Sequence, residues 1–506
     1  MSTTTTPRGA DGAPAAAPSA AERGPSWGTL LVLLAGVFIT TLDFFIVNVA
    51  IPATQADLGA SAAAIQWVVA GYGLALAALL ITGGRLGDMV GRRRMYMIGM
   101  GLFTLASAAC GLAGSPDVLI AARVAQGAAA ALLMPQVLGI VNIVYTGQHR
   151  ARAFMAYGLT IGFAGVFGQL IGGGLIEIDL FGLGWRSIYW INVPVGIAAL
   201  LITPRLVPES RGARGTRLDF GGVLLVTLAM VAIVLPLVQG REQGWPLWTW
   251  LSLAAAPLLV AGFVWYQRRR AVRGGAPLID MVMFRERSFA AGLGVMLAYQ
   301  LAMASFFLVL ALYLQMGHGM SALDSGLLFA ALGAGYFLGA TQAEKLAARL
   351  GRQVLTLGAL LTALGYGVLA ETVGATGATG SVGWLIPGLV VSGYGMGVAL
   401  APMSAIVLAG VSARYAASAA GVLNTAQQVG NALGVALVGI VFYGELGAGL
   451  VPNEYAHAFT WALIPLIAFC VGTALLVQLL PRVSGSAPGS VPAAQAGERE
   501  VMIPVG

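Results

Sequence analysis

Two charged residues stand inside long apolar stretches of the sequence. Asp43 lies in LLVLLAGVFITTLDFFIVNVAIP, and Arg123 lies in VLIAARVAQGAAAALLMPQ. A charge at the centre of a bilayer costs about 2.5–3.5 kcal/mol on insertion scales, so we expect Asp43 to face a polar cavity or to be neutral much of the time. Low dielectric favours the neutral carboxyl group, which would let this acid load and release a proton. The structural alternative is a hydrogen bond to Asn48 or to a neighbouring helix.

Arg123 cannot carry the proton itself, because a guanidinium group stays protonated in proteins. It can tune a nearby acid, order water or hold an anionic substrate group. The structural alternative is an ion pair between helices, although such buried pairs seldom add stability over apolar packing.

The stretch GGRLGDMVGRRR, Gly83–Arg94, is a basic break between two apolar runs. It cannot lie in hydrocarbon, so we expect a tight turn at a membrane surface. Its arginines place this turn on the cytoplasmic side. Asp88 is expected to cap the following helix, and Gly87 and Gly91 to allow positive φ. A partner charge across a domain boundary would make the turn a conformational latch.

A glycine-rich run, AYGLTIGFAGVFGQLIGGGLI, follows later in the chain. Glycines at a spacing of four let helices approach closely, and a dense run also permits bending. Close packing is the simpler interpretation, and a moving hinge at Gly168, Gly172 and Gly173 is a further hypothesis. Gln169 lies among these glycines and needs a hydrogen-bond partner.

Other polar and aromatic residues in the apolar runs are candidates for lining a substrate cavity. Any one of them is more often a helix contact or an interfacial anchor. They are Asn48, Gln66, Trp67, Tyr72, Gln126, Gln136, Asn192, Tyr299, Gln300, Phe306, Tyr313, Asn424, Gln427 and Gln428.

Composition indicates a polytopic membrane protein. Hydrophobic residues make up 58% of the chain and charged residues 9%, against about 25% charged in soluble domains. The net charge of +7 could suggest nucleic acid, but the arginines are in short loops, so we expect no such partner. Cys110 and Cys470 lie in apolar runs, the three histidines lack metal-ligand spacing, and no phosphate-binding loop occurs. We therefore expect no disulfide and no cofactor.

Apolar runs of 18 or more residues predict 14 spans. Their approximate limits are 28–51, 64–83, 95–113, 117–136, 152–176, 185–203, 219–239, 247–266, 288–314, 322–342, 354–371, 383–409, 416–443 and 456–480. With a cytoplasmic amino terminus, only Arg186 and Arg241 fall in outer loops. An omitted span would invert every later loop, so the bias predicts an even number of spans with both termini inside.

A faint internal repeat divides the chain. Glu344–Val354 can be laid on the Gly83–Arg94 turn, and Gly430 and Gly434 repeat the spacing of Gly168 and Gly172, each eight spans later. Repeated halves are typical of transporters. We expect six-helix bundles at 27–204 and 288–481, two inserted helices with cytoplasmic loops at 205–287, and disordered cytoplasmic tails at 1–26 and 482–506. The basic segment 268–287 could form an interfacial helix.

These motifs resemble those of the major facilitator superfamily, specifically its 14-span drug:proton antiporters, over nearly all of residues 27–481. The resemblance implies an all-α membrane protein of two six-helix bundles with two inserted helices. The matching positions are Gly84, Asp88, Gly91 and Arg92 in the loop motif, Asp43, Asn48 and Pro52 in the first span, Arg123 and Gly127 in the fourth, and Gly168, Gly172 and Gly173 in the fifth.

The resemblance also implies roles for these residues. Asp43 and Arg123 would serve proton coupling, and the Asp88 turn would serve the switch between inward and outward states. The chain departs from the pattern at Phe44, where the family often has Thr, and at Gln169, where Pro commonly follows the glycine. The missing proline weakens a specific bend in the fifth span.

The expected function is proton-driven export of amphipathic or cationic organic compounds, such as antibiotics, dyes or biocides, by alternating access in a bacterial plasma membrane. We expect a monomer whose partners are protons, lipid and a small-molecule substrate. One proton crossing about 100 mV supplies roughly 2.3 kcal/mol, enough for roughly a fifty-fold gradient of a neutral compound. A nutrient importer or facilitator is the alternative within transport. A membrane-embedded enzyme is disfavoured because Asp117, Glu177 and Asp179 are scattered.

Overall fold

The computed structural model describes residues 27–211, 218–275, 277–408, 416–446 and 451–481, and these ranges contain helices and turns but no strand. The expected tails, 1–26 and 482–506, lie outside the described residues. The helices are α1 (Trp27–Leu58), α2 (Ala62–Val90), α3 (Arg92–Gly111), α4 (Pro116–Val144), α5 (Gly147–Ile178), α6 (Ser187–Trp190), α7 (Asn192–Leu206), α8 (Phe220–Gln239), α9 (Leu247–Val272), α10 (Arg287–Leu312), α11 (Ala322–Leu350), α12 (Gln353–Thr376), α13 (Ile386–Leu408), α14 (Ala416–Glu445) and α15 (Pro452–Val477).

Twelve helical segments of the described chain are long and apolar enough to cross a membrane, or thirteen if the bent α5 counts as one span. The two parts of α5 meet at an angle of 45° between Gly165 and Phe167. The expected count of fourteen spans exceeds thirteen by one, because α3 is not among the counted segments. That helix has 20 residues, but its first turn consists of three arginines, which lower its hydropathy.

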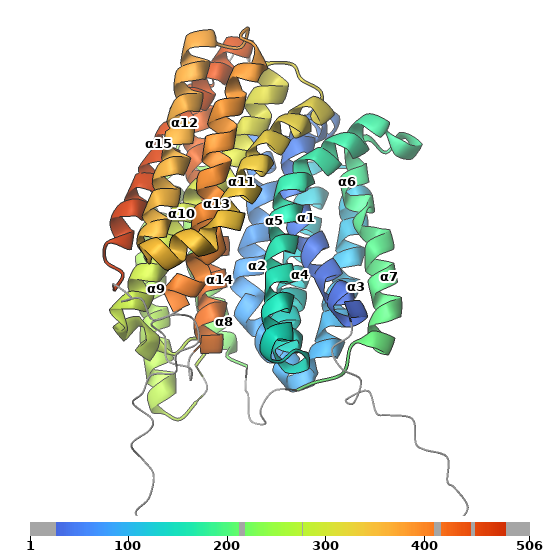
Figure 1. The fold of residues 1–506 in the computed structure, drawn as a ribbon, viewed down its shortest axis with the longest axis vertical. Helices are drawn as coiled ribbons and strands as arrows, with labels where there is room; N and C mark the ends of the chain where they lie inside the picture. The colour runs from blue at the N-terminus through green and yellow to red at the C-terminus, as the bar shows by residue number, and fades with distance from the viewer. Residues whose placement is uncertain (1–26, 212–217, 276, 409–415, 447–450, 482–506) are drawn as a thin grey trace, which may run out of the picture.

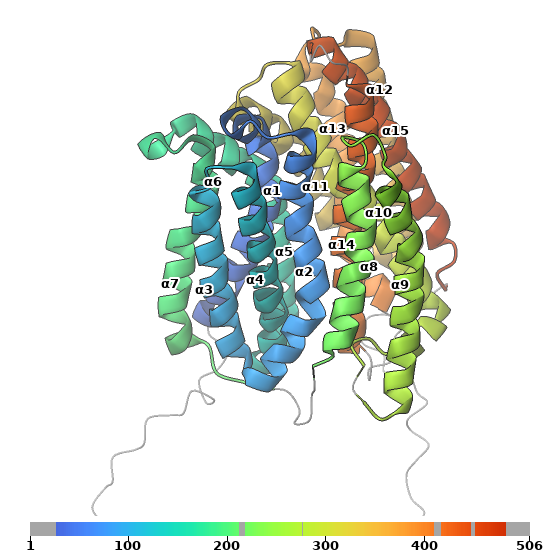
Figure 2. The same cartoon turned by 180° about the vertical axis from the view of Figure 1, so that it is seen from behind.

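Helices α1–α7 pack together as an N-terminal half, and α10–α15 pack together as a C-terminal half (Figure 1). The halves meet along α5 and α11 and along α2 and α14. Helices α8 and α9 form a hairpin that lies outside this interface, with α8 beside α2 and α14 (Figure 2). We name the two ends of the molecule by the α2–α3 junction, the Gly91 end, and the α1–α2 junction, the Gly59 end.

Glycines bring corresponding helices into backbone contact in both halves. A Cβ atom at Gly83 of α2 would lie 2.0 Å from the carbonyl oxygen of Ala131 in α4. In the second half, a Cβ atom at Gly339 of α11 would lie 2.2 Å from the carbonyl oxygen of Tyr394 in α13. The same close packing of small residues therefore occurs at equivalent places, as a repeat requires.

The segment between α9 and α10 is not the interfacial helix that we expected. It contains one short 3₁₀ helix, η3 (Met281–Arg285), and its apolar residues Leu278, Ile279 and Met283 are buried. These side chains pack against Phe289 and neighbouring helices of both halves. A helix on the membrane surface would have left this apolar group exposed to the interface.

Asp219 anchors this segment to the hairpin. It caps α8 by accepting a hydrogen bond from the Gly222 backbone, and it also accepts bonds from Gln267, Tyr266 and the Leu278 backbone, at 2.8–3.0 Å. Burial alone would raise the pKa of Asp219, but these hydrogen bonds together lower it below the ordinary value of an aspartate.

We predict that Asp219→Asn lowers the free energy of unfolding by about 1–3 kcal/mol, because buried donors lose a charged acceptor. The lowered pKa means that this stabilisation is complete above the ordinary pKa and is lost as the pH falls through the lowered value. The difference in unfolding temperature between the two proteins in detergent should therefore shrink only in strong acid. Asp280→Asn, which alters a more exposed cap of η3, is the control and should change little.

Candidate functional site

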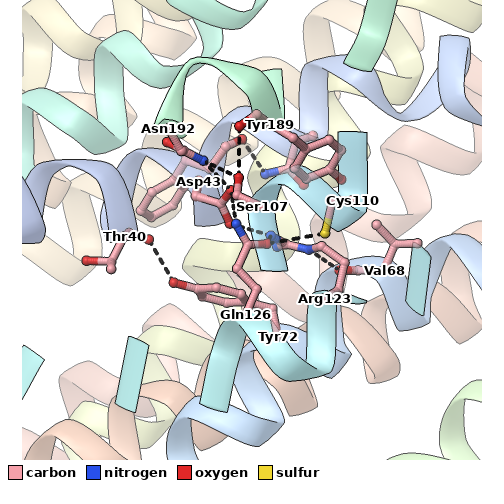
Figure 3. A network of polar contacts seen from close by, with 12 residues as sticks. Thr40, Asp43, Val68, Tyr72, Ser107, Cys110, Arg123, Gln126, Tyr189 and Asn192 are labelled. Atoms are coloured by element: carbon pink, nitrogen blue, oxygen red, sulfur yellow. Dashed lines mark hydrogen bonds and ion pairs between the residues drawn. The ribbon is translucent and has the colours of Figure 1, made fainter. Parts of the chain in front are cut away.

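Asp43 of α1 and Arg123 of α4 form an ion pair inside the N-terminal half (Figure 3). The Nη1 atom of Arg123 donates to Oδ2 of Asp43, and both side chains have an exposed fraction of 0%. The structural alternative considered for Arg123, a pair between helices, is therefore present. Since buried pairs seldom add stability, its presence in an apolar bundle still calls for a functional explanation.

The second carboxylate oxygen of Asp43 is also occupied. Its Oδ1 atom accepts from Nε2 of Gln126 at 2.8 Å and from Nδ2 of Asn192 at 2.9 Å. Asn192 Nδ2 also donates to Ser107 Oγ at 3.0 Å, and Ser107 donates to the carbonyl oxygen of Tyr189 at 2.8 Å. The side chains of this network come from α1, α3, α4 and the start of α7, and Ser107 also binds the backbone of α6, so a change of charge at Asp43 acts on side chains of four helices (Figure 3).

Arg123 is held by shape as well as by charge. Its Nε atom donates to the carbonyl oxygen of Val68 at 3.0 Å, and Nη1 also donates to Gln126 at 2.8 Å. The guanidinium carbon lies 4.4 Å from the ring centroid of Tyr72 and 5.9 Å from that of Tyr189. A planar, forked cation fits these contacts, whereas a point charge does not.

We predict that Arg123→Lys abolishes the export that the resemblance implies, although it keeps the positive charge, because an ammonium group cannot reach Val68, Gln126 and Asp43 together. Uptake and efflux assays of a fluorescent substrate in whole cells would measure this loss. Arg186→Lys is the matched control, since Arg186 forms an exposed pair with Asp57 and should tolerate the change. Equal export by both variants would contradict the geometric role of Arg123.

The described residues leave no polar cavity at Asp43 in this conformation. Every residue from Thr40 to Ile51 is buried, and Asp43 itself is fully enclosed. The reason is that Arg123, Gln126 and Asn192 fill the positions around the carboxylate that water would otherwise take. The carboxylate of Asp43 is therefore not exposed to water in this conformation.

The two halves touch backbone to backbone at the Gly59 end. A Cβ atom at Gly173 of α5 would lie 2.4 Å from the carbonyl oxygen of Ala322, at the start of α11. A Cβ atom at Gly326 of α11 would lie 2.7 Å from the carbonyl oxygen of Gln169. Gln315 adds a hydrogen bond across the same interface, to the carbonyl oxygen of Val49 at 3.0 Å. This end is therefore closed.

Within the N-terminal half, the glycine-rich face of α5 packs on α1. A Cβ atom at Gly168 would lie 3.4 Å from Leu42, and one at Gly172 only 2.6 Å from Ile46. Gln169, which stands where the family commonly has proline, donates to the carbonyl oxygen of Phe45 at 2.6 Å. The expected partner for this amide is thus a carbonyl two residues from Asp43.

Asn48 does not bond Asp43, but the other form of the structural alternative is present, because Asp43 accepts hydrogen bonds from the neighbouring helices α4 and α7. Its Nδ2 atom donates to the same Phe45 carbonyl oxygen as Gln169, at 3.0 Å. The oxygens Asn48 Oδ1 and Gln169 Oε1 are buried without a hydrogen-bond partner among the described residues. The amides of Asn48 and Gln169 therefore bind the backbone of α1 and not the side chain of Asp43.

The other cavity candidates fall into three groups. Tyr72 and Gln126 belong to the Arg123 network, whereas several others make contacts inside one half. Gln136 donates to the carbonyl oxygen of Gly83 at 2.8 Å, Tyr299 bonds Thr362 at 3.0 Å, and Phe306 packs on Tyr366 with ring centroids 4.5 Å apart. These three make contacts between helices in this conformation.

The remaining candidates lie near the interface between the halves. Gln300 donates to Asn431 at 3.3 Å, and Asn431 donates to Gln428 at 2.9 Å, which forms a chain of amides on α10 and α14. Gln300 Oε1, Gln66 Oε1 and Trp67 Nε1 have no hydrogen-bond partner among the described residues. Asn424 and Gln428 are half-buried on α14. Neutral donors and acceptors therefore remain available on both sides of the interface.

The Gly83–Arg94 stretch is mostly helical, so the expected tight turn is confined to Gly91. Helix α2 continues to Val90, and only Gly91, with φ of +120°, breaks it. Its counterpart Gly351 has φ of +57° between α11 and α12, in agreement with the repeat. Positive φ was correctly expected for Gly91. The same expectation is wrong for Gly87, which has helical φ and packs on Gln136.

Asp88 does not cap α3. It lies in α2 and forms an ion pair with Arg92 at 2.7 Å, within the same half. The carboxylate at the start of α3 is Glu209, which accepts from the backbone of Arg93 at 3.1 Å. A Cβ atom at Gly84 would lie 3.5 Å from the Cβ atom of Pro135, which is an ordinary van der Waals distance. No latch across the domain boundary occurs at Asp88 among the described residues.

Sequence reasoning missed several members of the site. Ser107 and Tyr189 complete the network around Asp43, and Glu209 lies in a basic loop that was interpreted only through its arginines. Ser107 could have been noticed as a polar residue in an apolar run. Tyr189 carried no signal, because its backbone carbonyl, not its hydroxyl group, makes the hydrogen bond. The described residues contain no group of three or more side chains that could hold a metal ion.

Comparison with known proteins agrees with this architecture. The family described as Major Facilitator Superfamily matches residues 33–435. The chain is 40% identical over 442 residues to a probable actinorhodin transporter of Streptomyces coelicolor, covering 87% of this chain and 76% of the relative. It is 34% identical over 477 residues to a tetracenomycin C resistance and export protein of Streptomyces glaucescens, covering 93% and 86%.

Solved structures share the fold at lower identity. A crystal structure of an auto-inhibited POT family peptide transporter superposes with a TM-score of 0.66 at 14% identity, covering 91% of this chain and 98% of the other. At that identity the likeness establishes the fold alone. The chain is thus a multi-pass membrane transporter and not an enzyme, and it belongs to the major facilitator superfamily.

Proposed function

We propose that this chain is a proton-coupled antiporter that exports organic antibiotics by alternating access. The observation that carries the proposal is the fully buried Asp43–Arg123 pair, linked to four helices of one half. Protonation of Asp43 would neutralise the carboxylate and leave Arg123 without its counterion. The network would then rearrange, and the helices that share it would take a second arrangement.

The substrate class follows from the relatives and from the distribution of charge. The two relatives described above are named for actinorhodin transport and for tetracenomycin C resistance and export. Asp43 is the only buried carboxylate within a membrane-spanning helix of the described chain, and both of its oxygens are occupied. A cationic drug therefore has no free buried acid to bind, which favours uncharged amphipathic compounds over cations.

The topology supports the same function. We propose 14 spans, with α3 and the bent α5 each crossing the bilayer, and domains at 27–204, 205–287 and 288–481. The Gly91 end would face the cytoplasm, because the arginines of the α2–α3 junction lie there. Both tails would then be cytoplasmic, in a bacterial plasma membrane, around a monomer. The closed Gly59 end would face outward, so the structure corresponds to a state closed to the outside.

Everted vesicles test the coupling and its direction. Tetracenomycin C added to the medium of non-energised vesicles should acidify that medium, because an antiporter moves protons outward as the compound enters the lumen. A proton-coupled nutrient importer, the alternative, would make the medium more alkaline when its substrate is added. A facilitator would leave the pH of the medium and the pH of the lumen unchanged. Transport of tetracenomycin C without medium acidification would refute antiport.

A further inference from the structure

The α8–α9 hairpin is fastened to α2 at the Gly59 end through Glu242. This residue lies in the turn between α8 and α9. Its Oε1 atom accepts from the backbone of Ala63 at 2.7 Å, and its Oε2 atom accepts from Ser61 Oγ at 3.3 Å. A carboxylate at a helix amino terminus is stabilised by the free N–H groups and by the helix dipole. Glu242 therefore holds the hairpin turn at the start of α2.

The hairpin is fastened to α2 at the Gly91 end as well. Arg85 of α2 donates to the carbonyl oxygens of Pro277 and Leu278, in the segment after α9. The backbone N–H of Leu278 donates in turn to Gln267 of α9 at 2.7 Å and to Asp219 at the start of α8 at 3.0 Å. Arg85 is thus joined to both ends of the hairpin through one short backbone segment.

Contact with the C-terminal half is different in kind. Met230 and Val234 of α8 pack against Val429 and Leu433 of α14, and these side chains are apolar. No hydrogen bond or ion pair between α8 and α14 is present in the described part of the chain. Hydrogen bonds fix position and direction, whereas an apolar contact tolerates small sliding of packed helices.

We propose that the α8–α9 hairpin moves as a rigid part of the N-terminal half, with Arg85 and Glu242 as its positioning residues, and slides on α14. Chain order alone leaves the hairpin free to follow either half, since it connects to both. The proposal rests on the alternating-access function proposed above. It assigns the moving surface to the α8–α14 contact and makes the chain after Leu278 the covalent connection to the C-terminal half.

Distances between spin labels test this assignment on the full chain in nanodiscs. Labels are placed on Cys introduced at Ile143 of α4, Val272 of α9 and Leu350 of α11, all exposed, in a background where Cys110 and Cys470 are Ala. The distribution of distances between the labels at 143 and 272 should be narrower than that between the labels at 272 and 350. An equally broad or broader 143–272 distribution overturns the proposal without any variant of the fastening residues.

The double variant Arg85→Gln, Glu242→Gln tests the residues themselves. It should broaden the 143–272 distribution roughly twofold, because neutral side chains make weaker hydrogen bonds than charged ones. The matched control is Arg269→Gln with Glu445→Gln, which removes the same two charges at the same two ends from exposed residues. Broadening in the control, or none in the double variant, contradicts the assignment.

Export of tetracenomycin C is measured on the same proteins. A chain that gives the expected distances but no proton-linked export refutes the proposed function and leaves the fastening intact. A chain that exports but gives a broad 143–272 distribution refutes the fastening alone.

Discussion

Asp43→Asn should reduce proton-driven export to the level of cells that lack the protein. Asparagine has nearly the same shape as aspartate, so Gln126 and Asn192 keep a neighbour of the right size. However, the side chain can no longer exchange a proton, and Arg123 loses the only carboxylate that contacts it among the described residues. Transport would then lack the step by which the proton gradient drives the change of state.

The same substitution has a structural cost that must be separated from the functional one. Removal of one partner from a buried pair costs about 3–5 kcal/mol, because the remaining charge is left uncompensated. The double variant Asp43→Asn, Arg123→Gln removes both charges and should recover most of that stability. We expect the double variant to fold, with an unfolding temperature above that of Asp43→Asn, and still not to export.

Efflux of a preloaded dye from energised cells, with surface expression and unfolding temperature measured in parallel, would check these results. If the pair were only structural, the neutral double variant would export normally. Gradient-dependent efflux by that variant would remove Asp43 from the mechanism.

Gly173→Leu should also abolish export, for a different reason. A Cβ atom at this position would lie 2.4 Å from the carbonyl oxygen of Ala322, a distance that real Cβ atoms do not adopt. The leucine would therefore keep α5 and α11 apart at the Gly59 end. Since alternating access requires this end to close in part of the cycle, the variant should remain in states that are open there.

The neighbouring glycine supplies a matched control. A Cβ atom at Gly174 has no atom within 4 Å, so Gly174→Leu should leave export unchanged. Reaction of an impermeant maleimide with Ser325→Cys, a buried position on α11, reports on the opening. The reaction should be faster in Gly173→Leu than in Gly174→Leu. Equal rates, together with equal export, would mean that backbone contact at Gly173 is not needed.

The parts of the site that the sequence predicted are those with a local physical signal. An acid and an arginine in apolar runs identified Asp43 and Arg123, and a glycine between two helices identified the positive φ of Gly91. The partners of Asp43 are separated from it by 83 and 149 residues at Gln126 and Asn192. They could not be assigned without knowing which helices pack together.

Helix ends explain the errors at the α2–α3 junction. Polar composition marked Gly83–Arg94 as a turn, but a helix can continue into polar sequence beyond the membrane, and α2 does so to Val90. Asp88 is therefore inside a helix, one turn before Arg92, where an ion pair is its natural contact. Helix ends are less certain than the existence of helices.

The count of spans and the choice of cavity residues both depend on how the helices pack. Hydropathy treats each residue alone, so three arginines at the start of α3 lower the score of a helix that is otherwise packed in the bundle. Likewise, polar residues such as Gln136 and Tyr299 looked available in the sequence, but each is used by a neighbouring helix. Packing decides which polar groups remain free.

The enclosure of Asp43 by residues of one half has a consequence for the evolution of resistance. The amide chain of Gln300, Asn431 and Gln428 belongs to the other half, so cargo recognition and energy input would occupy separate parts of the protein. Under the function proposed above, substitutions in this amide chain on α10 and α14 would change the exported compounds and leave the Asp43 network intact.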